Sequence, residues 1–437
     1  MRDVARIVNA LDGENAPINW LGVSYGTVRE QSRQKPYELT NFQIIGMQLI
    51  QLFPDRVGKF ILDGVVDPTY WSDRPQYLGR SGWLADADAA YNGFTRVCVA
   101  AGPDNCEILQ PGETAEALNE RIRAGLDEIH NNYNASSPTS YLNIVTLMLT
   151  YMYIPNDWPD LVKLIGAFIG PTFATQVERS LDKHHKQLVD RLDHMPTLNM
   201  PVFPMVHHVA RRQSPNPQNF QDLLAVTRST MAMIAIACGD GADANRYNIE
   251  TKQVFEEMIR LSREVSSMFG ATYVPMLQCH KWTSRAVERY TGPWNAKPKN
   301  PVLVVSTELD PVTPFRSAQL ITTDAFLGTS ARLIRLWNFG HSSYASDSTC
   351  HQSAVFKYPN EDVLPRDKGT DGEDVVCPTE SKILGMGLLP TTRRVLAKTH
   401  RALQNPSIGL KTKTSPHYMT TSLNSQEPTI LAILRAL

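Results

Sequence analysis

Three residues in this sequence have the types and the surroundings that nucleophilic chemistry requires. Ser24 lies at the centre of a Gly-x-Ser-x-Gly pattern over residues 22–26, and Asp310 and His341 follow much later in the chain. A serine hydroxyl becomes reactive when a histidine removes its proton and a carboxylate orients the histidine. Backbone amides must also stabilise the oxyanion, and the amide of Tyr25, directly after the serine, is the donor that we expect. These residues predict acyl transfer through a serine nucleophile.

Each of the three residues follows a segment that we expect to be a buried strand. Short apolar runs at 18–23, 301–306 and 331–337 precede Ser24, Asp310 and His341 in turn. Such runs are typical of parallel strands that are buried on both faces, and sites form at the carboxyl ends of such strands. Taken singly, the aspartate could be a turn residue before proline and the histidine a surface residue. Their order along the chain, Ser–Asp–His, is that of α/β-hydrolases and favours a shared site.

Two other carboxylates could take the place of Asp310. Asp63 and Asp67 come at the end of, and just after, a further strand predicted at 57–63. We rank both below Asp310 because Asp67 precedes Pro68 and also fits an ordinary turn.

The remaining patterns predict a doubly wound, mostly parallel α/β sheet. Helical patterns at 41–53 and 315–326 alternate with the strands, and a helix at 3–11 carries Val4, Ile7, Val8 and Leu11 on one face. Strand patterns are missing between the second and third strands, as in a helical cap inserted into the sheet. The predicted division has four parts: a first part of the hydrolase core at 1–68, a helical cap at 69–297, a second part of the core at 298–377 and an irregular basic tail at 378–437.

Composition excludes several classes of function. The 437 residues carry a formal net charge of −1, so no long-range attraction to nucleic acid is expected. No apolar run approaches the roughly 18 residues of a membrane span. No cysteine pair has zinc-ligand spacing, and the paired histidines at 184–185 and 207–208 have no matching carboxylates. We therefore expect no metal, no cofactor and a small peptide or ester as substrate.

The cysteine content and the N-terminus point to different compartments. An even count of six cysteines in loop-rich surroundings fits three disulfides and a secreted protein, although six unrelated buried thiols would give the same count. The first residues of the chain have no signal-peptide pattern, so the chain as encoded would stay in the cytoplasm.

Distinctive motifs lie at 22–27, 53–57, 62–68, 279–282, 292–294, 309–314 and 340–341. They resemble those of the tripeptidyl-aminopeptidase-like (TAP-like) α/β-hydrolases, a branch of the prolyl-aminopeptidase family of serine peptidases, and a fungal origin is expected. The resemblance implies a secreted exopeptidase in which a helical cap restricts access to the N-terminus of the substrate. It also implies three disulfides, which are Cys98–Cys106, Cys238–Cys279 and Cys350–Cys377.

The sequence departs from the family pattern in two places. The family has several strands and a His-Gly-Gly-Pro loop before the nucleophile, so we expect this chain to be truncated and to lack the second oxyanion donor, at a cost of roughly 10²–10³ in rate. The lost strands would also expose a sheet edge. Residues 28–43 intervene between the nucleophile and its helix, and their codons can match splice sites. A retained intron is our hypothesis for this segment, with a natural surface insertion as the alternative.

Together these patterns predict a serine hydrolase, most readily an aminopeptidase that releases short N-terminal peptides through an acyl-enzyme. A carboxylic-ester hydrolase with the same three residues is one alternative. An inactive, truncated product is the other.

Overall fold

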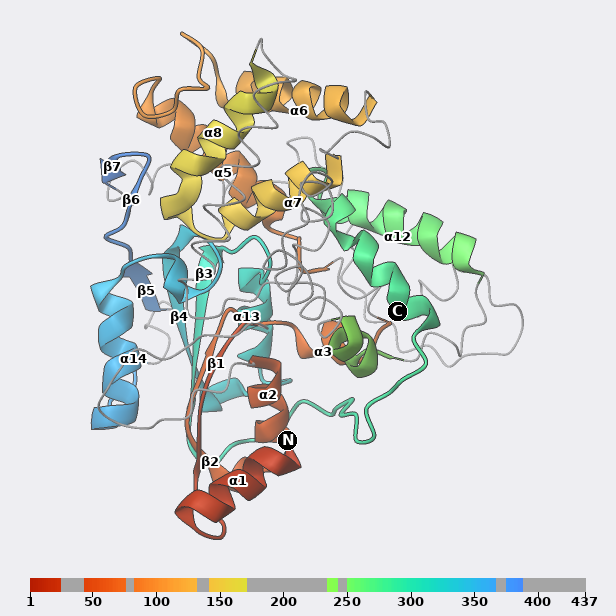
Figure 1. The fold of residues 1–437 in the computed structure, drawn as a ribbon. Coiled ribbons are helices and arrows are strands. Elements are labelled where there is room, and N and C mark those ends of the chain that lie inside the picture. Colours follow the sequence, from red (N-terminus) through yellow and green to blue (C-terminus); the bar gives the residue numbers. More distant parts are fainter. Residues whose placement is uncertain are drawn as a thin grey trace, which may run out of the picture.

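A five-stranded parallel sheet forms the centre of the molecule. The computed structural model describes residues 1–24, 43–75, 82–131, 141–170, 234–242, 250–366 and 375–387. Its strands follow the order β1-β2-β3-β4-β5 (Figure 1), with bounds Ile18–Val23, Val57–Asp63, Val302–Leu309, Ala331–Phe339 and Val375–Pro378. Every residue of β3 is buried, as expected of a strand that is covered on both faces. The predicted doubly wound sheet is therefore confirmed, and the architecture is that of an α/β-hydrolase.

Helices cover both faces of this sheet. Alternate side chains of a strand point to opposite faces of the sheet. On one face, Phe60 and Val304 belong to the apolar cluster with α2 (Gln43–Leu52) and α13 (Phe315–Ile321). Their neighbours Ile61 and Val305 pack with Tyr358 of α14 (Thr349–Glu361) on the other face. The strand ends are thus held between two apolar layers, which fixes where the residues after each strand lie.

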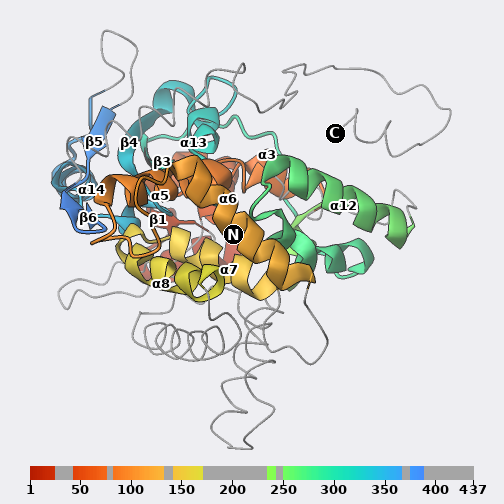
Figure 2. The ribbon, with the colours of Figure 1, turned by 90° about the horizontal axis from the view of Figure 1, so that it is seen from above.

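A group of helices lies beyond the carboxyl ends of the strands (Figures 1 and 2). In the described part of the predicted cap, 69–297, the chain forms helices and no strand. The main helices are α3 (Pro68–Ser72), α5 (Ala87–Ala101), α6 (Ala115–Asn131), α7 (Tyr141–Met152), α8 (Trp158–Ile169) and α12 (Thr251–Val265). The 3-10 helices of the whole described chain are η1 (Pro54–Arg56), η3 (Pro155–Asp157), η5 (Gly270–Lys281), η6 (Gly328–Ser330) and η7 (Ser343–Ala345).

The helices of the segment 69–297, called the cap below, pack directly on the sheet at the end of β4. Phe339 belongs to the same apolar cluster as the cap helices, and its ring lies 5.3 Å from that of Trp158 in α8. Gly93 of α5 has no side chain where this ring lies, since a Cβ there would be 2.1 Å from the Phe339 ring. The close approach of α5 to β4 therefore depends on a glycine.

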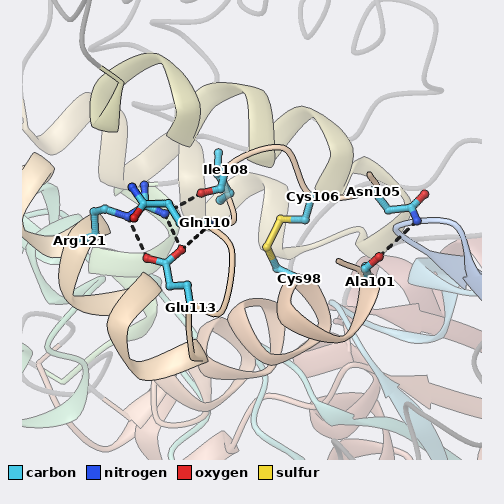
Figure 3. The surroundings of a disulfide bond; sticks show 8 residues. All are labelled: Cys98, Ala101, Asn105, Cys106, Ile108, Gln110, Glu113 and Arg121. Atoms are coloured by element: carbon cyan, nitrogen blue, oxygen red, sulfur yellow. Dashed lines mark hydrogen bonds and ion pairs between the residues drawn. A yellow bond between two sulfur atoms is a disulfide. The ribbon is translucent and has the colours of Figure 1, made fainter. Parts of the chain in front are cut away.

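Three disulfides join segments in the pairing that the resemblance implies. Figure 3 shows Cys98–Cys106, which closes the loop after α5, next to a salt bridge between Arg121 and Glu113. Cys238–Cys279 connects the short helical segment at 234–240 to η5, and Cys350–Cys377 connects α14 to β5. The predicted disulfides are confirmed.

Some elements differ from the expectation. Helix α1 (Arg2–Asp12) forms, but Ile7 and Leu11 of its expected apolar face are 50% and 66% exposed. Helix α13 ends at Ile321, five residues before the predicted end. The hydroxyls of Thr322 and Thr323 bind the carbonyls of Gln319 and Leu320 and so stop the helix there.

The C-terminal part of the described chain contains strands that the sequence pattern did not predict. β5 has four residues, too few for an alternation pattern to stand out. Two further strands, β6 (Lys382–Ile383) and β7 (Met386–Gly387), form a hairpin within the predicted irregular tail. Ile383 and Leu384 of this hairpin are buried in the apolar cluster of the cap. Residues 388–437 of the tail lie outside the described residues.

Candidate active site

Ser24 lies at the turn that follows β1. Its backbone N–H donates to the carbonyl of Asp63 at the end of β2 (2.8 Å), which extends the pairing of these strands by one residue. Its φ is +49°, in the left-handed region that non-glycine residues rarely adopt. Strain of this kind is common where a serine is presented on a sharp turn from strand to helix.

Asp310 lies directly after β3 and is fully buried. Its Oδ1 accepts the N–H groups of Val312 (2.9 Å) and Thr313 (2.8 Å), and its Oδ2 accepts the Thr313 hydroxyl (2.6 Å) and the N–H of Ser342 (2.9 Å). Burial would raise the pKa of Asp310. The charge of His341 and hydrogen bonds from His341, Thr313 and Ser342 outweigh it and hold the pKa below its ordinary value. The carboxylate is therefore ionised at neutral pH.

His341 lies directly after the turn that ends β4. Its Nδ1 lies 2.9 Å and 3.0 Å from the two carboxylate oxygens of Asp310, and its Nε2 lies 2.5 Å from the Ser24 Oγ. An anionic acceptor at Nδ1 favours the tautomer that carries its proton there. This leaves the Nε2 lone pair free to accept the serine proton. The three side chains that the sequence singled out are thus in contact, in the geometry of a nucleophile, a base and an orienting acid.

The cap contributes a contact to this histidine. The N–H of His341 donates to the carbonyl of Tyr153 (2.8 Å), between α7 and η3, and the two rings lie edge to face at 4.9 Å. Gly340, before the histidine, has φ +104°, and a Cβ there would lie 2.7–2.8 Å from Tyr153, Pro155 and Ala345. The histidine is therefore held between the sheet and the cap.

The two alternative acids have other partners. The Asp67 carboxylate accepts the N–H groups of Thr69 and Tyr70 and so caps the N-terminus of α3. The Asp63 carboxylate is buried and accepts the N–H (3.0 Å) and the hydroxyl of Ser343. Burial raises the pKa of Asp63 to about 6, although the bonds from Ser343 oppose the rise. Of the three aspartates, Asp310 is the one that contacts the imidazole.

Several predicted features lie outside the described residues. These are Tyr25 with its amide, residues 28–42 of the interrupting segment, and the histidine pairs at 184–185 and 207–208. Among the residues that the structure does describe, no group of three or more histidine, cysteine or acidic side chains could hold a metal ion. The same part of the chain contains no helix long and apolar enough to cross a membrane.

Sequence reasoning missed the residues that support the site. Thr313 lies in the same motif as Asp310 and could have been proposed as a donor to its carboxylate. Ser342 and Ser343 directly follow His341, but nothing in their type reveals that each binds a different buried carboxylate. Tyr153 is 188 positions before the histidine, and no local pattern connects the two.

Comparison with known families gives a match over part of the chain. Residues 266–377 match the model of a family described as TAP-like protein, while no curated protein sequence matches the chain. The matched segment includes β3, β4, Asp310 and His341, and it supports a TAP-like α/β-hydrolase. Ser24 lies outside the match. A fungal origin and the prolyl-aminopeptidase branch stay predictions.

Proposed function

We propose that this protein is a serine hydrolase in which Ser24 is the nucleophile, His341 the general base and acid, and Asp310 the residue that orients the histidine. The observation that carries the proposal is the continuous contact from Asp310 through His341 to Ser24, with 2.5 Å between His341 Nε2 and Ser24 Oγ. Each side chain comes from the carboxyl end of a different parallel strand, where sites of such sheets form. The match of residues 266–377 to an α/β-hydrolase family supports the reaction class.

In the proposed reaction, Ser24 Oγ attacks the substrate carbonyl carbon while its proton passes to His341 Nε2. The tetrahedral intermediate collapses when His341 returns the proton to the leaving nitrogen or oxygen, which leaves the acyl group on the serine. Water then attacks the acyl-enzyme by the same steps in reverse. Asp310 stabilises the imidazolium in both halves without taking the proton. The Tyr25 amide is our expected oxyanion donor.

We propose peptides with a free N-terminus as the substrate class, with short peptides released. The description of the matched family and the helices beyond the strand ends support this choice. An ester hydrolase would use the same three residues, so the geometry favours neither leaving group. We infer an oxidising, extracellular location from the three disulfides.

A fluorophosphonate probe, which reacts with an activated serine, tests the reaction class. We expect stoichiometric labelling of the folded protein, and no labelling of Ser24→Ala. Folded wild-type protein that does not react would contradict the proposal and favour the inactive product. Aminoacyl and tripeptidyl nitroanilides assayed beside short acyl nitrophenyl esters then decide between peptidase and esterase.

A further inference from the structure

Asp63 connects the nucleophile segment to the histidine segment. Its backbone carbonyl accepts the N–H of Ser24 (2.8 Å), while its carboxylate accepts the N–H and the hydroxyl of Ser343, two residues after His341. It is 2% exposed and lies at the end of β2, whose neighbours are β1 and β3. One residue thus contacts both of the segments whose separation decides whether the serine proton can be transferred.

The loop that carries His341 needs such an anchor. The residues on either side of the histidine, Gly340 and Ser342, have φ of +104° and +61°. The left-handed region costs a non-glycine residue roughly 1–2 kcal/mol, so Ser342 keeps this conformation because its surroundings hold it there. Its N–H binds Asp310 and its carbonyl accepts the hydroxyl of Thr307 (3.0 Å). The bonds from Ser343 to Asp63 fix the next residue.

A buried carboxylate at this position is unfavourable for folding. Burial raises the pKa of Asp63 to about 6, and the nearby negative charge of Asp310 also raises it, against the opposing effects of Ser343 and His341. Buried groups with raised pKa values cluster at functional sites, where the cost in stability is offset by a gain in geometry.

We propose that Asp63 is a positioning residue that holds the His341 loop, through Ser343, at the correct distance from Ser24. The inference rests on the proposed serine hydrolase function. It differs from a role as the acid of the triad, because Asp63 acts on the backbone after the histidine and leaves the imidazole to Asp310.

The experiment compares Asp63→Ala, Asp63→Asn, Ser343→Ala and the double variant Asp63→Ala/Ser343→Ala. Asp67→Ala is the matched control, because it removes a carboxylate whose hydrogen bonds cap α3 at Thr69 and Tyr70 instead of anchoring the histidine loop. For each variant, kcat and KM are measured per fluorophosphonate-reactive site, with the melting temperature recorded in parallel. Hydrogen exchange of peptides over residues 340–346 is followed by mass spectrometry and does not depend on catalysis.

We expect Asp63→Ala to lower kcat about tenfold to a hundredfold, the effect of losing a hydrogen bond to a charged group, with little change in KM. Exchange in 340–346 should become faster while exchange in β4 stays the same. Asp63→Asn should recover most of the activity, since its amide oxygen can still accept the Ser343 N–H. Ser343→Ala should have a smaller effect than Asp63→Ala, because its N–H is kept. The double variant should match Asp63→Ala.

Two results would overturn the proposal: unchanged exchange of the loop in Asp63→Ala, or a lower melting temperature with the wild-type kcat per reactive site. A wild-type protein that does not react with the probe would instead refute the proposed function, and the exchange measurement would still decide whether Asp63 holds the loop.

Discussion

The ends of β2 and β3 present two aspartates in nearly the same setting. Asp63 and Asp310 each end or follow a buried parallel strand, and both are buried with exposed fractions of 2% and 0%. Their ionisation nevertheless shifts in opposite directions. The pKa of Asp310 lies below its ordinary value, and the pKa of Asp63 is raised to about 6.

The partners explain this difference. Asp310 accepts two backbone N–H groups and a hydroxyl from its own turn, another N–H from Ser342, and contacts the imidazole of His341. Asp63 accepts the two donors of Ser343. Burial acts on both, so the larger number of donors and the direct contact with His341 explain why the pKa of Asp310 falls while that of Asp63 rises. The position after a strand therefore does not determine the role of an aspartate. The turn that follows it does.

The largest expected effect is a difference in kcat between asparagine substitutions of the two aspartates. Asp310→Asn should lower kcat by about 10⁴, because an amide cannot stabilise the imidazolium and favours the wrong tautomer of His341. Asp63→Asn should stay within about tenfold of the wild type, since it keeps an acceptor for the Ser343 N–H. Both values come from steady-state kinetics on whichever nitroanilide or nitrophenyl ester the wild-type protein hydrolyses. Equal losses in the two variants would contradict the roles assigned here.

Sequence reasoning located the catalytic candidates but could not describe this contrast. The strands at 18–23 and 57–63 were predictable because buried parallel strands have continuous apolar runs. The position of Asp310 was predictable because its Asp-Pro-Val-Thr turn follows a third such run, in β3. The contact between His341 and Tyr153 could not be predicted from the sequence, since it depends on how the cap packs on the sheet. The four-residue β5 was missed because its pattern is too short to detect.

Two glycines, Gly340 before His341 and Gly64 after Asp63, should differ in how much their substitution lowers stability. Gly340→Ala should lower the free energy of unfolding by about 3 kcal/mol or more. Its Cβ would lie 2.7–2.8 Å from Tyr153, Pro155 and Ala345, at a φ of +104°. Gly64→Ala, at φ +63° with its nearest contact at 3.2 Å, should cost about 1–2 kcal/mol. Urea unfolding measures both, and a larger cost for Gly64→Ala would contradict the packing described.

Titration of Asp63 should make the free energy of unfolding vary with pH. An acid whose pKa is higher in the folded than in the unfolded protein binds extra protons on folding. Its contribution to the free energy of unfolding therefore falls as the pH rises from about 4 to about 6, by at most about 1.4 kcal/mol per pH unit. Asp63→Asn should remove this loss, so the variant gains stability relative to the wild type between pH 4 and pH 7. Asp73 and Asp86, whose pKa values are also about 6, are present in both proteins and cancel in the difference. A difference that does not vary with pH would show that Asp63 does not titrate in this range.

The smallest expected effect concerns a single hydroxyl in the Asp310 turn. Thr313 Oγ1 donates to Asp310 Oδ2 at 2.6 Å and lies 3.2 Å from His341 Nδ1, so it helps to keep the carboxylate ionised and beside the ring. Thr313→Val has nearly the same shape and removes this donor, while the N–H donors of Val312, Thr313 and Ser342 remain. Because a hydrogen bond to a charged group contributes about 1.5–3 kcal/mol and the other donors can compensate in part, we expect kcat to fall about tenfold. Thr313→Ser, which restores the hydroxyl, should recover the activity. Wild-type kcat in Thr313→Val would mean that the backbone donors alone hold Asp310, and the contrast with Asp63 would then rest on the charge of His341.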